Sequence, residues 1–344
     1  EAGTALTTGD GNVAVGFEAL LTATTASNNT AIGLNALRLN TSGAQNTAVG
    51  RLSADALTEG SANVALGNAA LTADTLGSKS VAVGNSALGA QNFTTATDSF
   101  NTAVGYNAGT LVTTGVRNTI LGGLAGDALT TGDRNVAVGY TTLSSDTAGR
   151  KSTAIGYQAL LSQNFSTTTE SFNTAVGYDA GNAITTGVKN TIIGGLAADR
   201  LTDADFNTAI GYGTLSTDTL GSRSTAIGAF ALEAQNFTTA TATYNVAVGY
   251  EAGLSVTTGQ YNTLLGGRAG DKITDGDANV AVGVNAIGTD TLGKYSVAIG
   301  MGALQTQNST TSTDTYNVAV GHNAGLSVTT GIQNTLIGGL AGDA

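Results

Sequence analysis

Hydrophobic and polar residues alternate in a five-residue block that recurs nineteen times along this chain. The block begins with Asn or Ser, continues with Thr or Val, then Ala (sometimes Ile or Leu), then Val, Ile or Leu, and ends with Gly. The run from Asn101 to Gly105 is one example. β-Branched residues at the second and fourth positions favour a pleated strand, in which the third side chain points to the opposite face. Each block is therefore predicted to form a short β-strand that ends at a corner.

The blocks follow one another at a regular spacing. Successive blocks begin 17 positions apart, except that the step after each block that begins with Ser is 21. Steps of 17, 17, 17 and 21 give a 72-residue super-repeat, which links Ser80, Ser152, Ser224 and Ser296. A period of 17 is too short for helical-hairpin repeats but suits one coil of a β-solenoid, whose parallel strands stack about 4.8 Å apart.

The predicted fold is therefore all-β. We expect a parallel β-solenoid or β-roll of about nineteen coils, with every fourth coil 21 residues long. Residues 1–344 would form a single repetitive shaft segment. Because both ends of the sequence fall within a repeat, we expect this segment to belong to a longer protein.

Two positions of each block have predicted structural roles. The leading Asn should stack on its equivalent in the next coil and share side-chain hydrogen bonds, as in other cross-β ladders. Gly fills the fifth position in all nineteen blocks, where a corner would need a positive φ or a close backbone approach. These roles are assigned to Asn101, Gly105, Asn118, Gly122, Asn135, Gly139, Asn173 and Gly177.

Further small and apolar residues recur between the blocks. An Ala at the eighth position and an apolar residue at the twelfth are expected to face inward on a second strand, as for Ala108 with Val112. Another Gly often lies three residues before the next block, as at Gly115, and predicts a second turn.

Both faces of the predicted strand are small or apolar. The third position is Ala in fifteen blocks and is larger only at Ile120, Ile192, Leu264 and Leu336. A strand with two apolar faces is typical of one that is covered on both sides. One face can cover the interior of the solenoid, and a neighbouring copy is the simplest cover for the other. A heterologous contact that closes into a ring predicts a homotrimer.

Composition narrows the possible functions. The chain has 49 Gly, no Pro, Cys or Trp, and 5% aromatic residues, which fits a thin core of small side chains. Without Cys, and with His322 as the single histidine, thiol chemistry and a zinc site are not expected. The net charge of −11 argues against nucleic acid as a partner. No apolar run reaches the roughly 20 residues of a membrane span, so membrane insertion is not expected.

Three patterns with possible chemistry are interpreted as structural. The run Gly122–Asp127 superficially resembles calcium-binding repeats, but its copies lie 72 positions apart, so a calcium site would need clustering at the axis of an oligomer. The Asp203–Asp205 and Asp275–Asp277 pairs suggest the two carboxylates of a glycosidase, yet they fall in turns, where Asp caps backbone groups. No Gly-rich stretch has Walker spacing. We predict no catalytic residue, metal, cofactor or enzyme activity.

The four long coils are the candidates for a binding function. Each adds four residues in a Thr-rich loop and ends with an aromatic residue before the next Asn. Insertions in solenoids map to one face, often the binding face, and an aromatic beside polar donors and acceptors suits a sugar. The alternative is a structural bulge whose aromatics pack on its flank. The candidate receptor-contact residues are Phe93, Thr94, Thr95, Phe100, Phe165, Thr167, Phe172, Phe237, Thr238, Tyr244, Thr310 and Tyr316.

These repeats resemble those of known fibrous proteins. The blocks, with Tyr106-Asn107-Ala108-Gly109 after the corner and Thr-Thr-Gly before the next Asn, resemble repeats in bacteriophage tail fibres. The block at Ser296 is similar to the head repeats of trimeric autotransporter adhesins, although the repeats of those heads have a shorter period. The resemblance covers essentially the whole chain through short, low-complexity motifs. It implies a trimeric β-roll or β-helix used for attachment.

The expected function is therefore structural. We expect a phage tail-fibre segment that gives a stiff shaft, sits in the virion or otherwise outside the cell, and meets other fibre or tail proteins. Host-surface glycans or proteins are the expected receptors. A bacterial adhesin head and an ice-binding solenoid, with the Thr-Thr pairs as a flat ladder, remain alternatives; an enzyme is a more distant one.

Overall fold

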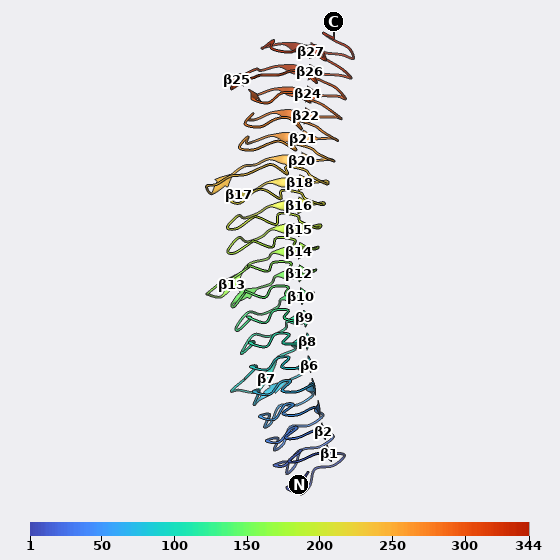
Figure 1. Cartoon of the computed structure of the whole chain (residues 1–344), viewed down its shortest axis with the longest axis vertical. Helices are drawn as coiled ribbons and strands as arrows, with labels where there is room; N and C mark the ends of the chain where they lie inside the picture. Colours follow the sequence, from blue (N-terminus) through green and yellow to red (C-terminus); the bar gives the residue numbers. More distant parts are fainter. Residues whose placement is uncertain (344) are drawn as a thin grey trace. The chain divides into compact units, whose positions relative to one another are not determined.

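The computed structural model describes residues 1–343, which form strands, turns and loops without a helix. The chain divides into two units, Glu1–Phe172 and Asn173–Ala344. Within each unit, successive coils lie one above another, and each coil contributes one three-residue strand to a common sheet (Figure 1). Below, positions of a coil are counted from the first residue of its block.

The first unit contains nine such strands among its described residues, all parallel. They are β1 (Val13–Val15), β2 (Thr30–Ile32), β3 (Thr47–Val49), β4 (Val64–Leu66), β6 (Val81–Val83), β8 (Thr102–Val104), β9 (Thr119–Leu121), β10 (Val136–Val138) and β12 (Thr153–Ile155). Two-residue strands pair beside the long coils: β5 (Gly77–Ser78) with β7 (Thr97–Asp98), and β11 (Gly149–Arg150) with β13 (Thr169–Glu170).

The second unit has the same architecture, with ten three-residue strands in its described part. They are β14 (Thr174–Val176), β15 (Thr191–Ile193), β16 (Thr208–Ile210), β18 (Thr225–Ile227), β20 (Val246–Val248), β21 (Thr263–Leu265), β22 (Val280–Val282), β24 (Val297–Ile299), β26 (Val318–Val320) and β27 (Thr335–Ile337). Its two-residue pairs are β17 (Gly221–Ser222) with β19 (Thr241–Ala242), and β23 (Gly293–Lys294) with β25 (Thr313–Asp314).

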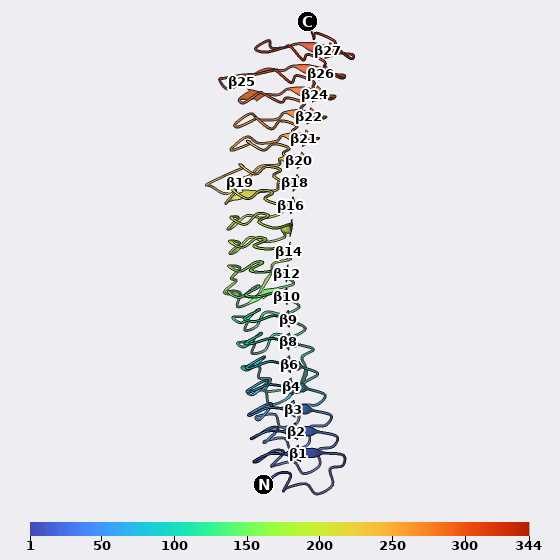
Figure 2. The same ribbon diagram turned by 45° about the vertical axis from the view of Figure 1, so that its right-hand side comes forward.

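The register of the sheet confirms the predicted period. Val64 pairs with Val81, its equivalent in the next coil, whereas Val81 pairs with Thr102 across one of the long coils. The four additional residues leave the strand register unchanged because they lie in a loop to the side of the sheet. These loops project beyond the neighbouring coils (Figure 1 and Figure 2). The all-β parallel solenoid is thus confirmed in both units.

The interior of each coil is filled by positions 3, 8, 9 and 12. In β8, Ala103 is fully buried, while Thr102 and Val104 on either side of it point outward and remain partly exposed. Ala108 and Val112 are also fully buried, which confirms that they face inward. The expected second strand is wrong, however, because residues 106–111 form consecutive turns and Val112 lies outside any strand. The inward direction of position 3 leaves positions 2 and 4 as the outward strand face.

The size of the residue at position 3 is matched by position 9. A Cβ added to Gly109 would lie 2.8 Å from Ile120 Cδ1, and one added to Gly126 would lie 3.5 Å from the same atom. Most coils with Ala at position 3, such as Ala82, instead carry a buried Leu at position 9, such as Leu88. The larger position-3 residues therefore fill interior space that a position-9 side chain leaves free.

The Asn and Gly roles are also as predicted. Asn101 Oδ1 accepts the backbone N–H of Asn118 at 2.9 Å, and Asn118 Nδ2 donates to the carbonyl of Gly132 at 2.9 Å, so each Asn links neighbouring coils and also closes its own. Asn135 and Asn173 bond in the same way. Gly105 has φ +141°, and a Cβ there would overlap the carbonyl of Gly122. The corners at Gly139 and Gly177 have φ of +140° and +143°.

Candidate functional site

The long-coil loops place the predicted receptor-contact residues in two different environments. Thr94, Thr95, Thr167, Thr238 and Thr310 are exposed at the tips. The phenylalanines behind them are not: Phe93, Phe165 and Phe237 are only 5%, 6% and 5% exposed. They fold under the loop and fill it, so their assignment as contact residues is corrected to a packing role. In the fourth loop Ser309 takes this place.

The aromatic residues that end the long coils lie at the surface. Phe100, Phe172, Tyr244 and Tyr316 are 44–50% exposed. Lys79 Nζ lies 5.2 Å from the ring centroid of Phe100, and Lys151 Nζ lies 4.8 Å from that of Phe172. Phe100 and Phe172 therefore form cation–π contacts with the basic residue of the coil before them.

Basic and aromatic residues continue at this last coil position in each unit. The basic-aromatic line consists of Lys79, Phe100, Arg117, Arg134, Lys151 and Phe172 in the first unit, and of Lys189, Phe206, Arg223, Tyr244 and Tyr261 in the second. Six of the 13 basic residues of the chain lie on it. Acidic neighbours offset part of this charge, as where Lys79 pairs with Asp98 at 2.6 Å. Net charge alone did not indicate this concentration.

A buried polar network underlies each long coil. Gln91 Nε2 donates to Asp74 Oδ2 at 2.6 Å and approaches Ser80 Oγ at 2.8 Å, while Gln91 Oε1 accepts from Asn101 Nδ2 at 2.9 Å. Asp74 Oδ1 also accepts the backbone N–H of Phe93 at 3.1 Å. All four polar side chains are fully buried. In the long coil, Ser80 occupies the first block position in place of Asn, and the Gln91 amide oxygen accepts the hydrogen bond from Asn101 that an Asn side chain accepts in several other coils.

The network is repeated in every super-repeat. Asp146 with Gln163 and Ser152, Asp218 with Gln235 and Ser224, and Asp290 with Gln307 and Ser296 make the same contacts. Burial raises the pKa of Asp74 and of Asp146 above the ordinary 3.8, although the Gln amide and the backbone N–H groups oppose this by stabilising the carboxylate. Sequence reasoning missed these residues. The signal was that Asp, Ser and Gln recur together once in each super-repeat.

The Asp pairs in turns bond to the neighbouring coil. Asp205 Oδ1 accepts the backbone N–H of Val188 at 2.7 Å, and Asp277 Oδ1 accepts that of Gln260 at 2.9 Å. Asp203 and Asp275 accept threonine hydroxyls of the preceding coil. These contacts link coils and support the structural interpretation of the pairs. No three His, Cys, Asp or Glu side chains of residues 1–343 converge as metal ligands would.

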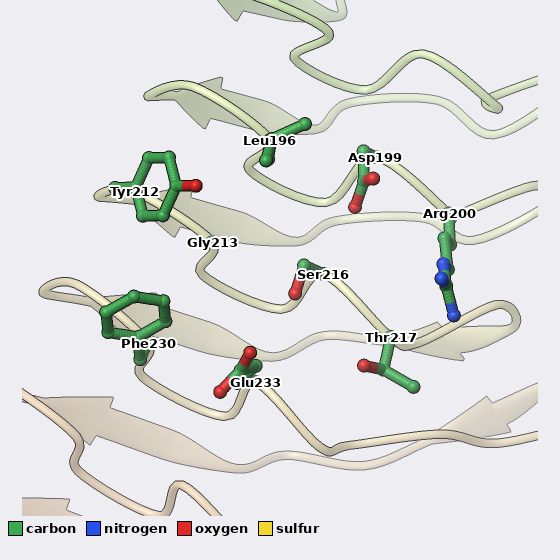
Figure 3. Close-up of a pocket in the computed structure, with 9 residues that line it drawn as sticks. All are labelled: Leu196, Asp199, Arg200, Tyr212, Gly213, Ser216, Thr217, Phe230 and Glu233. Atoms are coloured by element: carbon green, nitrogen blue, oxygen red, sulfur yellow. The ribbon is translucent and has the colours of Figure 1, made fainter.

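A pocket of about 220 Å³ opens on the turn side of three coils of the second unit (Figure 3). Its middle coil has two small residues: Gly213 lies at the position that Leu196 and Phe230 hold in the coils beside it, and Ser216 lies between the larger Asp199 and Glu233. Tyr212 and Phe230 form one wall, with their rings edge to face at 5.5 Å and 85°. Arg200 and Thr217 lie on the opposite side (Figure 3).

The pocket also contains an acidic group with one unpaired oxygen. Asp199 Oδ1 is buried without a hydrogen-bond partner, and burial raises the pKa of this carboxyl. Among residues 1–343, Asp199, Arg200 and Glu233 form no ion pair within 4 Å. The pocket therefore presents charged groups whose bonding capacity the protein itself leaves unused. Sequence reasoning did not single it out.

Comparison with known proteins does not assign the chain to a family. No protein-family model matches the chain, and no curated protein matches it. The described residues include no helix long and apolar enough to cross a membrane.

Proposed function

We propose that this chain is a structural segment of a fibre, in which further copies of the same chain cover the outward strand face. The observation that carries the proposal is the exposure of aliphatic side chains at coil position 4, the last residue of each three-residue strand. Val104 is 38% exposed, Ile155 37%, Ile193 39% and Ile299 40%. The interior of each unit is complete without them, because position 3 and the turn residues behind it are already fully buried.

A second copy is the partner that matches this face best. The outward face presents the same chemistry once per coil, at the strand spacing of about 4.8 Å. A partner that buries this face along many coils needs the same spacing of about 4.8 Å. Another copy of the chain has this spacing because its coils stack in the same way. Closure into a trimer is our choice of symmetry, because heterologous contacts that close form rings and the resembling fibres are trimeric.

Attachment is the second part of the proposed function. The Thr-rich loop tips and the basic-aromatic line lie at the surface and recur along the chain, so weak contacts with a receptor would add through effective concentration. We place the fibre in a phage tail, with host-surface glycans or proteins as receptors. A bacterial adhesin head is the nearest alternative.

An ice-binding surface has less support. The first Thr of several Thr-Thr pairs donates its hydroxyl to the next coil, as Thr113 does to the carbonyl of Thr130 at 3.1 Å. The second position is interrupted by Glu59, Leu76 and Asp203. A measurement of thermal hysteresis tests this alternative.

The assembly is tested by light scattering on the purified chain and two variants. The native protein should show three times the 33.9 kDa chain mass. The double variant Val104→Asp/Ile155→Asp should shift toward a single chain, because each carboxylate would lose its hydration in the covered face. Thr114→Asp is the matched control, since Asp203 and Asp275 already occupy that coil position, and it should keep the native mass. A native protein that stays at 33.9 kDa at every concentration contradicts the proposal.

A further inference from the structure

The pocket of the second unit is lined partly by residues at positions that vary from one super-repeat to the next. Equivalent residues lie 72 positions apart, so the other super-repeats act as internal controls. Where the pocket has Gly213, Phe230 and Glu233, the preceding super-repeat has Thr141, Gln158 and Leu161, and the following one has Asn285, Gly302 and Gln305. Those coils form the same strands and turns, so folding does not require the pocket residues. Gly213, Phe230 and Glu233 occur together in this super-repeat alone, so the lining of the cavity is particular to it.

The lining selects a particular kind of ligand. The carboxylates of Asp199 and Glu233 can only accept hydrogen bonds when ionised, Arg200 can only donate, and the hydroxyls of Ser216 and Thr217 can do both. An ammonium ligand would meet a like charge in Arg200, and an anion would meet two in Asp199 and Glu233. A neutral ring with several hydroxyl groups satisfies both kinds of partner.

The aromatic wall and the size of the cavity agree with this choice. Tyr212 and Phe230 offer apolar ring surface, against which the C–H groups of a sugar ring can pack. A volume of about 220 Å³ is well above the roughly 10–15 Å³ that a cavity needs to hold one water. It is also below the ~300 Å³ at which pockets for drug-sized ligands begin. The cavity therefore suits one ring.

We propose that this pocket binds a single neutral pyranose ring of a glycan. Asp199 and Glu233 accept its hydroxyl groups, Arg200 donates to its oxygens, and Tyr212 and Phe230 pack against its face. The site goes beyond the assembly proposed above, because every lining residue belongs to one chain and lies on the turn side, outside the outward strand face formed by positions 2 and 4.

Saturation-transfer difference NMR on the full chain tests this site. The probes are the methyl pyranosides of glucose, galactose, mannose and rhamnose, with tetramethylammonium and methyl glucuronide as charged probes. We expect saturation transfer to at least one neutral pyranoside at millimolar concentration. The signal should fall at least tenfold in Gly213→Thr, which fills the cavity, and in Glu233→Leu, which removes an acceptor. Both changes introduce the residue found 72 positions earlier, so both variants should fold.

The control variant is Thr141→Gly, which makes the reverse change at the equivalent position of the first unit and should leave the signal unchanged. Silence of all neutral pyranosides overturns the proposal. So does a response to the charged probes alone, or a neutral-sugar signal that survives in both pocket variants. The mass measured by light scattering is independent of these outcomes, so a failed sugar site and a failed assembly are distinguishable.

Discussion

Left-handed backbone conformations are a regular feature at the residue scale. Positions 7, 9 and 17 of the shorter coils have positive φ, mostly at residues other than Gly, such as Ala62 at 58°, Leu71 at 53° and Arg117 at 60°. An L-residue in this region costs about 1–2 kcal/mol relative to the right-handed form. Hydrogen bonds between coils hold the conformation: Leu71 N–H donates to Ala87, and Arg117 N–H donates to Ser99. The stacked coils therefore supply what local preference does not.

Glycine at one of these positions should raise stability. Ala62→Gly removes the Cβ that disfavours φ 58°, and we expect an increase of up to about 1 kcal/mol in the free energy of unfolding. Ala65→Gly, three residues later and inward-facing in β4, is the control and should lower it. Thermal melts of the two variants give the comparison. If Ala62→Gly melts below the native protein, left-handed strain is not stored at this position.

The buried carboxyls predict an unusual pH dependence. Because burial raises the pKa of Asp74 and Asp146, the folded state binds protons more tightly than the unfolded state at these sites. Their contribution to stability is therefore greatest at low pH and declines as pH rises from about 3.8 through the raised pKa. The melting temperature of the native protein, minus that of Asp74→Asn/Asp146→Asn, should be larger at pH 4 than at pH 8. A difference that grows with pH contradicts the burial account.

At the scale of the element, the packing inside each coil depends on contacts between positions that are distant in the sequence. The alternation within the block predicted a strand, and the invariant Gly predicted its corner. The direction of position 3 was left open because both faces of the strand are apolar. It is settled by Ile120 against Gly109 and Gly126, a contact that only the path of the turn reveals. For the same reason, the chain around Phe93 suggested an exposed loop, although the loop folds over this residue.

The shared interior space of coil positions 3 and 9 can be tested by making the side chain smaller at position 3 and larger at position 9. Ile120→Ala should lower the free energy of unfolding by roughly 2–4 kcal/mol, because it leaves a cavity in a fully buried layer. Adding Gly109→Leu and Gly126→Leu should recover most of this loss, because Leu at position 9 above Ala at position 3 is the arrangement at Leu88 and Ala82. Denaturant unfolding of both variants measures the two effects. If the triple variant is less stable than Ile120→Ala, positions 3 and 9 do not share one space.

At the scale of the whole molecule, the regular sequence predicts the fold well and the binding surfaces poorly. The period fixes strand order and register because each block meets its copy in the next coil. The pocket near Ser216 escaped notice because no motif marks it: it arises from two small residues between larger ones in adjacent coils. Net charge likewise did not show that six of the 13 basic residues share one coil position. The repeated blocks predict the strands and their order, whereas a site formed by single variable residues of adjacent coils is recognised only in the structure.

The central claim concerns the two faces of each strand. The side chain at coil position 3 points into its own coil, and the side chain at position 4 contacts another copy of the chain. The chain has no cysteine, so single-cysteine variants report on one site at a time. The decisive measurement is the rate of thiol alkylation of Val104→Cys in the purified assembly, compared with Thr114→Cys on an exposed turn. Our account predicts that Val104→Cys reacts at least tenfold more slowly. Equal rates at the two positions would show that the outward strand face is open to solvent, and would contradict the account.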